Sequence, residues 1–424
     1  MATLTVSEFS CIKDATLNLS QLTILIGPQA SGKSVLSKLV YFCNSIIVRR
    51  FIHLRQRSTL AELQSDLAQD FKKWFPSSAW GKSAFTIAYT AGRFEVRISR
   101  KKTRKGLSDE VNIRFSDPFA ELYEKVLAQV QKEIAALRLK QPDEQATFRE
   151  WEVLWRLEQE TSEAFRKLME RDFLAAQSFV PAGRSFFTSI GKAIVAFEQG
   201  GMLDPLTVQF GRTFTSLRDR DTVFVSPNEP MSSRNAREEL MKKLFGGEIR
   251  YERDREYVIS DDGRKIPFSA LSSGQQELLP LWTVLNLVAA NSDHLIYIEE
   301  PEAHLFPSAQ NTLIEYLSGL VGGARRKRML ITTHSPYVLA KINNLLKAGE
   351  LAGRSPKTML PKLGSIVRKE FQLAPGSAAA FAIKDGVLHP ILDDDLIDGE
   401  YLDEVSGDIA KEFSALLEFE STLT

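Results

Sequence analysis

Apolar and polar positions alternate over the first 26 residues, and this spacing predicts three short strands. The strands are "LTVSEF", "ATLNL" and "LTILIG", and the last is almost entirely apolar, which is typical of a strand covered on both faces. A glycine-bearing loop follows, and a helical pattern begins near Lys33. Further along, the alternating stretches "FTIAY", "RFEVRIS" and "VNIRF" predict a group of antiparallel strands.

Helical spacing begins at Asp117, where the Asp-Pro pair is a helix-start signal with Pro118 at the first helical position. Apolar residues then recur at helical intervals until the polar break "KQPDEQ": Leu122, Val126, Val130, Ile134 and Leu137. A second run has an expected apolar face of Trp151, Leu154, Trp155, Phe165, Leu168 and Met169. The runs predict two antiparallel helices, each about 35 Å long at ~1.5 Å per residue. Their stripes need burial, either against the body of the protein or against a partner.

The second half of the chain alternates between helical and strand-like patterns. "SFVPAGRSFF" returns to strand and turn character, residues 205–248 are mostly helical, and "EIRYERDREYVISDDGRKIPFSA" contains a hairpin with "DDG" as its turn. Two apolar strands, in "HLIYIEEPEAHLFP" and "RMLITTHSPYVLAKI", end in polar residues, and short strands recur near "AFAIKDGVLHPIL". The whole pattern predicts an α/β fold with a mixed central sheet, an antiparallel subdomain and an inserted helical-hairpin arm.

Composition excludes several classes of protein. The 424 residues hold 54 Lys plus Arg and 54 Asp plus Glu, so a nucleic-acid site would have to be a local basic patch. Cys11 and Cys43 are too few for a disulfide framework or a zinc site, which favours a reducing interior. The first residues do not resemble a signal peptide, and the longest apolar run, Leu278–Ala290, is too short to span a bilayer. We expect a soluble, cytoplasmic protein without a membrane partner.

The segment "GPQASGKS" fits the phosphate-loop pattern G-x-x-x-x-G-K-[ST] and stands between an apolar strand and a helix, as that motif requires. Backbone N–H groups and the positive end of the helix hold phosphates there, so the chain is predicted to bind a nucleoside triphosphate. Lys33 reaches the β and γ phosphates, and the Ser34 hydroxyl ligates Mg²⁺. The expected binding residues are Gly27, Pro28, Gln29, Ala30, Ser31, Gly32, Lys33 and Ser34.

The apolar strand in "HLIYIEEPEAHLFP" delivers Glu299 and Glu300 at its carboxyl end. A phosphate-loop enzyme needs such acids, and we expect Glu299 to hold the Mg²⁺ shell and Glu300 to act as general base toward the attacking water. Two neighbouring glutamates after a strand are, taken alone, equally compatible with a solvated turn. The motifs on either side of them favour the catalytic interpretation.

Small polar residues open the segment "ALSSGQQELLP", although an apolar run follows it. Its Gly274 stands 25 positions before Glu299, and His334, in "TTHSP", stands 34 positions after Glu300. In order and spacing, the phosphate loop, this signature segment, the acidic strand and the histidine resemble an ATP-binding-cassette (ABC) ATPase. The motifs "LSSGQQE", "EEPEAHLFP" and "TTHSPYVL" resemble those of the branch that contains RecF, SMC and the overcoming-lysogenization-defect proteins. This branch includes ATPase subunits of anti-phage systems of the PARIS and Septu types.

The resemblance implies a composite site with ATP and Mg²⁺ as cofactors. In this superfamily the signature residues, here Ser272, Ser273, Gly274 and Gln275, approach the γ-phosphate of the nucleotide bound to the other subunit, so that ATP joins two chains in a homodimer or higher homo-oligomer. His334 would contact the γ-phosphate and help to orient water. The chain departs from the family pattern at Gln29 and Ala30, which replace the common Asn-Gly, and at Ser273, which replaces the first signature glycine.

The resemblance also suggests four parts. Residues 1–116 form the N-terminal part of an ATPase head, 117–176 the helical arm, 177–345 the C-terminal part of the head, and 346–424 an extension. The leading functional hypothesis is a nucleotide-switched scaffold in anti-phage defence, with a separately encoded, nuclease-like effector. The alternative is a DNA-repair ATPase that clamps DNA, for which the segments 100–105 and 324–328 are the basic candidates. A transporter ATPase ranks third because of the long insertion and the paired glutamates.

Three smaller questions are not settled by the sequence. Phe9 is either an adenine-stacking residue or, more commonly for such an aromatic, part of the core. Gln177 and Arg184 are both candidates for the family's Q-loop. The acidic string at Asp393, Asp394 and Asp395 is better explained as a solvated turn than as the metal site of a Toprim-type nuclease.

Overall fold

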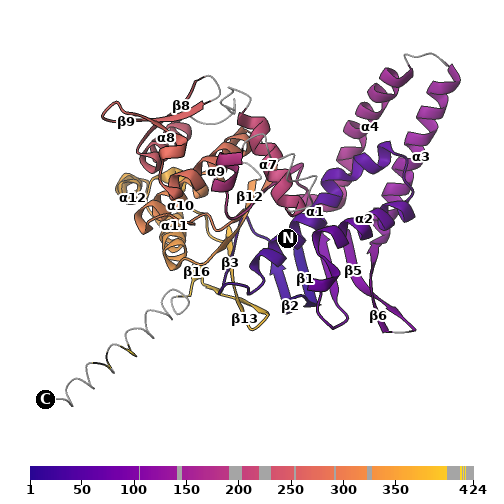
Figure 1. Ribbon diagram of the computed structural model, residues 1–424, viewed down its shortest axis with the longest axis horizontal. Coiled ribbons are helices and arrows are strands. Elements are labelled where there is room, and N and C mark those ends of the chain that lie inside the picture. Colours follow the sequence, from indigo (N-terminus) through magenta and orange to yellow (C-terminus); the bar gives the residue numbers. More distant parts are fainter. Residues whose placement is uncertain are drawn as a thin grey trace.

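The computed structural model describes residues 1–104, 106–140, 146–190, 203–218, 231–252, 255–290, 293–321 and 327–398, with residues 411, 412, 414 and 416 beyond them. The predicted α/β class is confirmed, and a mixed sheet of eleven strands organises the described part of the chain (Figure 1). From one edge to the other, the strands are β6 (Gly106–Phe115), β5 (Phe94–Thr103), β4 (Thr86–Ala91), β1 (Thr3–Phe9), β2 (Ile12–Asn18), β14 (Val387–Pro390), β13 (Ala378–Lys384), β3 (Leu22–Ile26), β12 (Lys327–Thr333), β11 (His294–Glu299) and β7 (Ala176–Val180).

The sheet has an antiparallel wing and a parallel half. β1 pairs with β2 and β4, β4 with β5 and β5 with β6, all antiparallel. The pairing of β4, β5 and β6 confirms the predicted group of antiparallel strands. β13, β3, β12, β11 and β7 are parallel neighbours, so their carboxyl ends meet at one edge. Ligands of open α/β sheets bind outside the carboxyl ends of the strands, and this edge is therefore the first place to look for the site.

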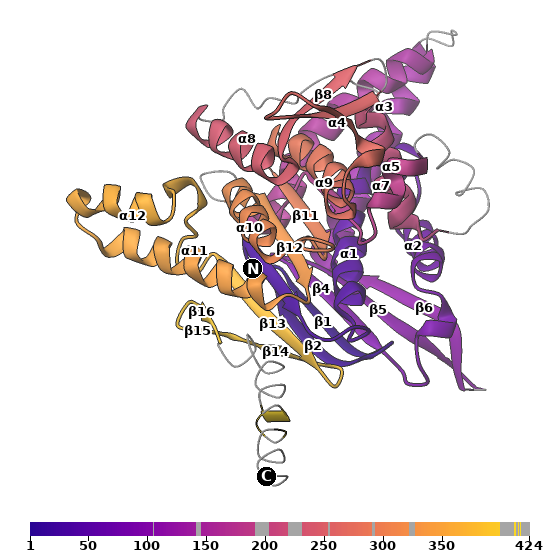
Figure 2. The same ribbon diagram turned by 60° about the vertical axis from the view of Figure 1, so that its left-hand side comes forward.

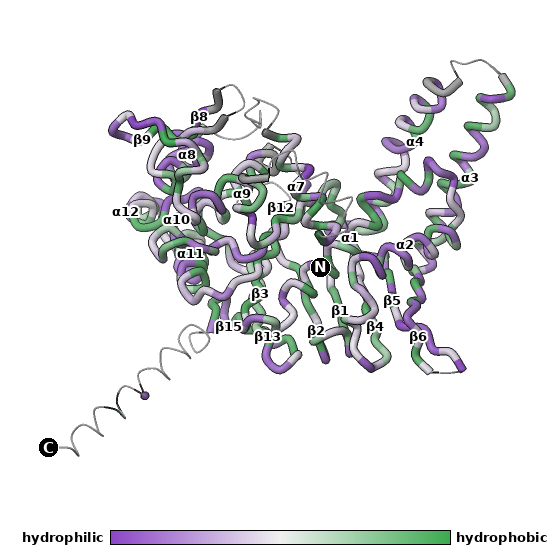
Figure 3. The backbone as a smooth tube through the Cα atoms, viewed as in Figure 1, coloured by the Kyte–Doolittle hydropathy of each residue, from purple (hydrophilic) through white to green (hydrophobic). Residues whose placement is uncertain are grey.

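Helices cover both faces of the parallel half (Figure 2). One face is covered by α1 (Lys33–Arg55), beside which α2 (Leu60–Trp74) lies over the antiparallel wing. The helices on the other face include α9 (Ser273–Ala290), α10 (Pro307–Val321) and α11 (Pro336–Arg354). Successive side chains of a strand point to opposite faces, so Leu295 and Tyr297 of β11 enter one core while Ile296 and Ile298 enter the other. The strands are accordingly among the most apolar parts of the chain (Figure 3).

The other helices and strands that follow β7 are shorter or lie outside the main sheet. They are the helices α5 (Ser185–Ile190), α7 (Pro205–Arg218), α8 (Met231–Phe245) and α12 (Leu360–Ile366), the three-stranded sheet of β8 (Gly247–Glu252), β9 (Arg255–Ser260) and β10 (Lys265–Pro267), and the ribbon of β15 (Leu392–Asp393) and β16 (Leu396–Ile397). The predicted "DDG" turn joins β9 to β10, and Gly263 has a φ of 81°, which favours glycine. The four-part division stays a prediction, and β13, which follows residue 346, lies inside the main sheet beside β3.

The predicted arm consists of α3 (Asp117–Lys140) and α4 (Ala146–Met169), which pack together and project beyond the sheet (Figure 1). Val130 and Ile134 are buried between them as expected, but Trp151 and Trp155 are 54% and 52% exposed. These two tryptophans therefore do not pack on the body, and burial against a partner stays a prediction. The base of the arm joins the core, where the Arg55 guanidinium of α1 lies 2.8 Å from the Glu158 carboxylate. No helix in the described ranges combines the length and the apolar character that a membrane span requires.

Candidate nucleotide-binding site

The phosphate-loop segment connects a fully buried strand, β3, to the first turn of α1. Gly32 precedes the helix with a φ of 106°, and a Cβ there would lie 2.4 Å from the Ile12 side chain, so only glycine fits this position. Pro28, Gln29, Ala30 and Ser34 are exposed. The loop therefore presents its backbone and the Ser34 hydroxyl to solvent at the amino end of a 23-residue helix, which is a ready site for phosphate.

The Lys33 side chain folds back over this loop. Its ammonium donates hydrogen bonds to the carbonyl oxygens of Gly27 and Pro28, both at 2.8 Å. Burial lowers the pKa of Lys33 from its ordinary value, while the carboxylates of Glu300 and Glu302 oppose the shift. The lysine is thus held close to the place where phosphate oxygens would enter, and a bound anion can replace the two carbonyls as its partner.

Glu299 ends β11 beside Thr332 of β12 and is only 7% exposed. One carboxylate oxygen, Oε2, accepts the N–H of Ala182 at 3.4 Å, whereas the buried Oε1 has no hydrogen-bond partner among the described residues. A buried carboxylate oxygen without a partner is costly unless a cation or a water completes it. The exposed Ser34 hydroxyl and this oxygen are both ligands that Mg²⁺ accepts, so the two residues fit the predicted metal role.

Glu300 turns away from the strand in a left-handed conformation with a φ of 44°, which is uncommon for a residue other than glycine. Its amide donates to the carbonyl oxygen of Thr332 at 2.9 Å, and its Oε1 lies 3.1 Å from Nε2 of His334. Both side chains are partly exposed, at 39% and 30%. The candidate base and the candidate switch histidine therefore share one solvent-facing contact.

Glu302 is a site residue that the sequence analysis missed. Its Oε1 accepts the N–H of His334 at 2.8 Å and the Thr333 hydroxyl at 2.5 Å, while its buried Oε2 has no partner in the described part of the chain. Through these bonds Glu302 fixes the segment that carries His334. The "EEPE" spacing was the only available signal, because the sequence does not reveal that the turn at Glu300 brings the third acid back toward β12.

The signature segment opens α9 with a capping box. Ser272 Oγ accepts the amide of Gln275 at 3.4 Å, and Gln275 Oε1 accepts the amide of Ser272 at 3.1 Å. Gly274 is packed so closely that a Cβ would lie 2.6 Å from the carbonyl oxygen of His304. Ser272 and Ser273 are exposed, so the amino end of this helix faces solvent. Local capping and close packing thus explain these small polar residues within a single chain.

The Q-loop candidates have different surroundings. Gln177 accepts hydrogen bonds from Asn44 at 3.1 Å and Tyr297 at 3.3 Å, which places its side chain between β11 and α1 rather than at the end of β7. Arg184 follows the end of β7 and is completely buried; its Nη1 donates to the carbonyl oxygen of Glu299 at 2.7 Å. Burial lowers the pKa of Arg184, and the carboxylate of Glu277 is the main opposing charge. Of the two residues, Arg184 contacts the candidate site.

Phe9 belongs to the core. It is 1% exposed, and its ring centroid lies 4.8 Å from that of Phe85 and 5.7 Å from that of Phe75. Asp393 and Asp394 are exposed, and Asp395 accepts the amide of Gly376 at 2.9 Å, as expected for a turn. In the described ranges no group of three or more His, Cys, Asp or Glu side chains is arranged to hold a metal.

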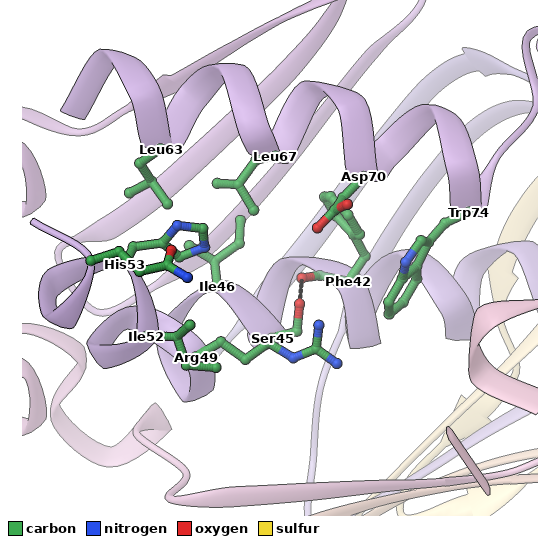
Figure 4. Close-up of a pocket in the computed structure, with 11 residues that line it drawn as sticks. Phe42, Ser45, Ile46, Arg49, Ile52, His53, Leu63, Leu67, Asp70 and Trp74 are labelled. Atoms are coloured by element: carbon green, nitrogen blue, oxygen red, sulfur yellow. Dashed lines mark hydrogen bonds between the residues drawn. The ribbon is translucent and has the colours of Figure 1, made fainter. Parts of the chain in front are cut away.

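A cavity of about 220 Å³ lies between α1 and α2, lined by residues such as Ile46, His53, Leu67 and Trp74 (Figure 4). These residues lie at least three turns down α1 from Lys33, or on α2. None of the predicted nucleotide residues lines the cavity, so it is separate from the phosphate loop.

A family model for an ATPase domain matches part of the chain. Residues 210–339 match the family model described as AAA ATPase domain, a segment that contains the signature, the Glu299–Glu300 strand and His334 but not the phosphate loop. No curated protein matches the chain. Among solved structures, the chain is similar to an SMC head domain from Thermotoga maritima, with 12% identity, coverage of 92% of this chain and 97% of that one, and a TM-score of 0.37.

Two further solved structures are similar to the chain at comparably low identity. One is an SMC head bound to the C-terminal winged-helix domain of ScpA, with 13% identity, coverage of 92% and 96%, and a TM-score of 0.42. The other is an SMC head with an extended coiled coil bound to the C-terminal domain of ScpA, derived from Pyrococcus furiosus, with 13% identity, coverage of 99% and 100%, and a TM-score of 0.37. Similarities this distant carry no information on the ligands or partners of this chain.

Proposed function

We propose that this protein is an ABC-type ATPase that binds ATP with Mg²⁺ at the carboxyl edge of its parallel sheet and hydrolyses it. One observation carries the proposal: at the carboxyl ends of the neighbouring strands β3, β12 and β11 stand the phosphate loop with Lys33, His334 and the Glu299–Glu300 pair. The AAA ATPase domain match supports it. Lys33 and the loop amides hold the phosphates, and Ser34 and Glu299 hold the metal.

The residues of the chain carry out the steps of hydrolysis. Mg²⁺, when bound, neutralises charge on the phosphate oxygens. Glu300 accepts a proton from the attacking water through its exposed carboxylate, and His334, 3.1 Å away, orients that water and the terminal phosphate. Glu302 keeps the main chain of His334 in place. The carboxylate and the imidazole must both be present, because each limits the positions that the other can adopt.

The proposed active form is a homodimer or a higher homo-oligomer joined by ATP. The exposed Ser272 and Ser273 at the amino end of the 18-residue helix α9 can reach a γ-phosphate of a second copy. Phe306 and Tyr337, which follow the acidic strand and His334, are 77% and 53% exposed. Exposed aromatic side chains beside the site support a protein contact there.

We assign the dimer a scaffold role for a separately encoded, nuclease-like effector, with anti-phage defence as the setting and the cytoplasm as the location. The arm supports this role because Trp151 and Trp155, one helical turn apart on α4, offer aromatic side chains to a partner. The alternative is a RecF-like or SMC-like ATPase that clamps DNA. It is favoured by the exposed Lys102 and Arg104 at the tip of the β5–β6 hairpin, although Arg100 is paired locally with Asp109.

The test combines nucleotide binding with DNA binding. Wild-type protein should bind ATP with Mg²⁺ by isothermal calorimetry, and Lys33→Ala should remove this binding, whereas Lys347→Ala, at an exposed i,i+3 ion pair, should not. Undiminished affinity in Lys33→Ala contradicts the proposed site. Binding to duplex DNA whose affinity falls steeply with salt, and which Lys102→Ala and Arg104→Ala weaken, would favour the clamp over the scaffold.

A further inference from the structure

Arg184 connects three segments that converge behind the candidate site. Its side chain is fully buried, and its guanidinium donates to the carbonyl oxygens of Pro181 at 3.2 Å, Glu299 at 2.7 Å and Glu300 at 3.3 Å. The first of these oxygens follows β7, the second belongs to the last residue of β11 and the third follows β11. A planar guanidinium has donors in a fixed fork, so these three oxygens are held in one mutual arrangement.

Glu277 links the same arginine to the signature helix. It is 1% exposed, and its carboxylate accepts the Arg184 amide at 2.8 Å and the Ser185 hydroxyl at 2.7 Å. The Nε atom of Arg184 lies 3.5 Å from this carboxylate and donates to the carbonyl oxygen of Glu277 at 3.3 Å. Glu277 is three positions after Gly274, so it lies one turn along α9 from the signature.

A buried ion pair of this kind adds little to the stability of the fold, because apolar side chains of similar volume would stabilise it equally well or better. The pair does fix the orientation of the groups that it contacts, since hydrogen bonds are directional. What it orients is the left-handed turn at Glu300, whose φ of 44° needs support from its surroundings. The Glu300 carbonyl is held by Arg184, its amide by Thr332, and its carboxylate then meets His334.

We infer that Arg184 and Glu277 form a positioning pair that ties the orientation of Glu300 to the signature helix α9. The inference rests on the proposed ATPase function and deepens it. A displacement of α9, such as contact of Ser272 with a phosphate of a second copy, moves Glu277, and Arg184 passes the movement to the main chain of Glu299 and Glu300. Hydrolysis thereby depends on whether the signature is engaged, while binding through Lys33 does not.

The experiment compares Arg184→Lys and Glu277→Gln with the exposed control Arg250→Lys, using the full chain. Turnover is measured as kcat for ATP, affinity as the Kd of a fluorescent ATP analogue, and folding as Tm. Because a misplacement of about 1 Å can reduce a rate about 100-fold, we expect kcat to fall roughly 10- to 100-fold while Kd changes less than about 3-fold. Arg250→Lys should match the wild type, since this side chain is 64% exposed.

A double variant distinguishes positioning from a general loss of structure. If Arg184 acts through Glu300, then Arg184→Lys should have no further effect on kcat once Glu300→Gln has removed the base, whereas independent structural damage would multiply the two losses. Should Arg184→Lys fail to fold, Ser185→Ala removes a single hydrogen bond from Glu277 and should still lower kcat about 3- to 10-fold.

The outcomes separate this inference from the function on which it rests. Normal kcat in folded Arg184→Lys, Glu277→Gln or Ser185→Ala overturns the positioning pair and leaves the ATPase in place. A wild-type protein that neither binds nor hydrolyses ATP overturns both. Multiplicative losses in the double variant reject action through Glu300.

Discussion

The Nε2 atom of His334 lies 3.1 Å from Oε1 of Glu300, across 34 positions of sequence. Parallel pairing of β11 with β12, in the register Glu299 to Thr332, brings the two strand ends together. The left-handed turn at Glu300 then points its carboxylate toward the loop after β12. The contact therefore follows from strand register and one unusual backbone conformation, and it places a carboxylate and an imidazole where water can reach both.

The Glu300→Gln substitution tests the role of this carboxylate. Gln keeps the shape and an acceptor oxygen but cannot take a proton, so kcat should fall about 10²- to 10⁴-fold while ATP binding persists. ATP should then accumulate in a stable dimer, measured by size-exclusion chromatography with saturating ATP and Mg²⁺. Glu239→Gln, at an exposed carboxylate paired with Arg368, is the control and should behave as wild type. A monomer under these conditions would contradict the trapped dimer.

Glu302 allows a graded test of how His334 is held. Glu302→Ala leaves the part-buried His334 amide and the buried Thr333 hydroxyl without their acceptor, and a buried donor without a partner costs about 1–3 kcal/mol. We expect a lower Tm and a kcat reduced about 10-fold or more, because His334 loses its fixed position. Glu302→Gln retains an acceptor oxygen and should recover most of both losses. Equal activity of the Ala variant and the wild type would rule out this role.

The phosphate loop could be predicted from sequence because its cause is local: a buried strand, glycines and a helix start within twelve residues of one another. Glu299, Glu300 and His334 could be named because strand ends carry them. Arg184 could be named only as one of two Q-loop candidates and Glu302 not at all, since their contacts lie 115 and 31 positions away. The neighbouring residues in the sequence do not indicate which carbonyl or amide these side chains contact after the sheet has formed.

The arm shows a different limit of sequence patterns. On α4 the residues that face α3 and the core, including Leu157 and Phe165, define one stripe. At 3.6 residues per turn, Trp151 and Trp155 lie roughly 80–120° from its centre. Their size suggested burial, but the side of the helix on which they lie carries Glu158 and Ser162, which bind arginines of α1 further down. Hydrophobicity alone therefore does not distinguish the side chains that pack within the chain from those left exposed on the arm.

Stability of the arm should follow burial rather than side-chain size. Ile134 is 1% exposed, so Ile134→Ala should destabilise the arm by about 2–5 kcal/mol through lost contacts and a cavity. Trp151→Ala, although it removes more atoms, should change stability by no more than about 0.5 kcal/mol because the indole is 54% exposed. Hydrogen exchange of α3 and α4 measures both. A larger loss of protection in Trp151→Ala than in Ile134→Ala would show that the tryptophan is buried against something.

Stability should also depend on pH through His294. This residue begins β11, is 3% exposed, and its Nε2 lies 2.9 Å from the Ser178 hydroxyl. Burial, with a smaller effect of Lys327, lowers the pKa of His294 to about 4. In the unfolded chain its pKa is about 6.5, so the unfolded state takes up the proton first as the pH falls. The contribution of His294 to stability is complete above about pH 6.5 and is lost progressively toward pH 4, by at most roughly 3 kcal/mol.

The His294→Gln substitution removes this titration while keeping a polar side chain beside Ser178. We expect the midpoint of urea unfolding to fall less between pH 7 and pH 4.5 in the variant than in the wild type, even if the variant is less stable at pH 7. His389→Gln is the matched control, because His389 is exposed on β14 and should leave the pH profile unchanged. Parallel profiles for His294→Gln and the wild type would mean that other groups dominate acid unfolding in this range.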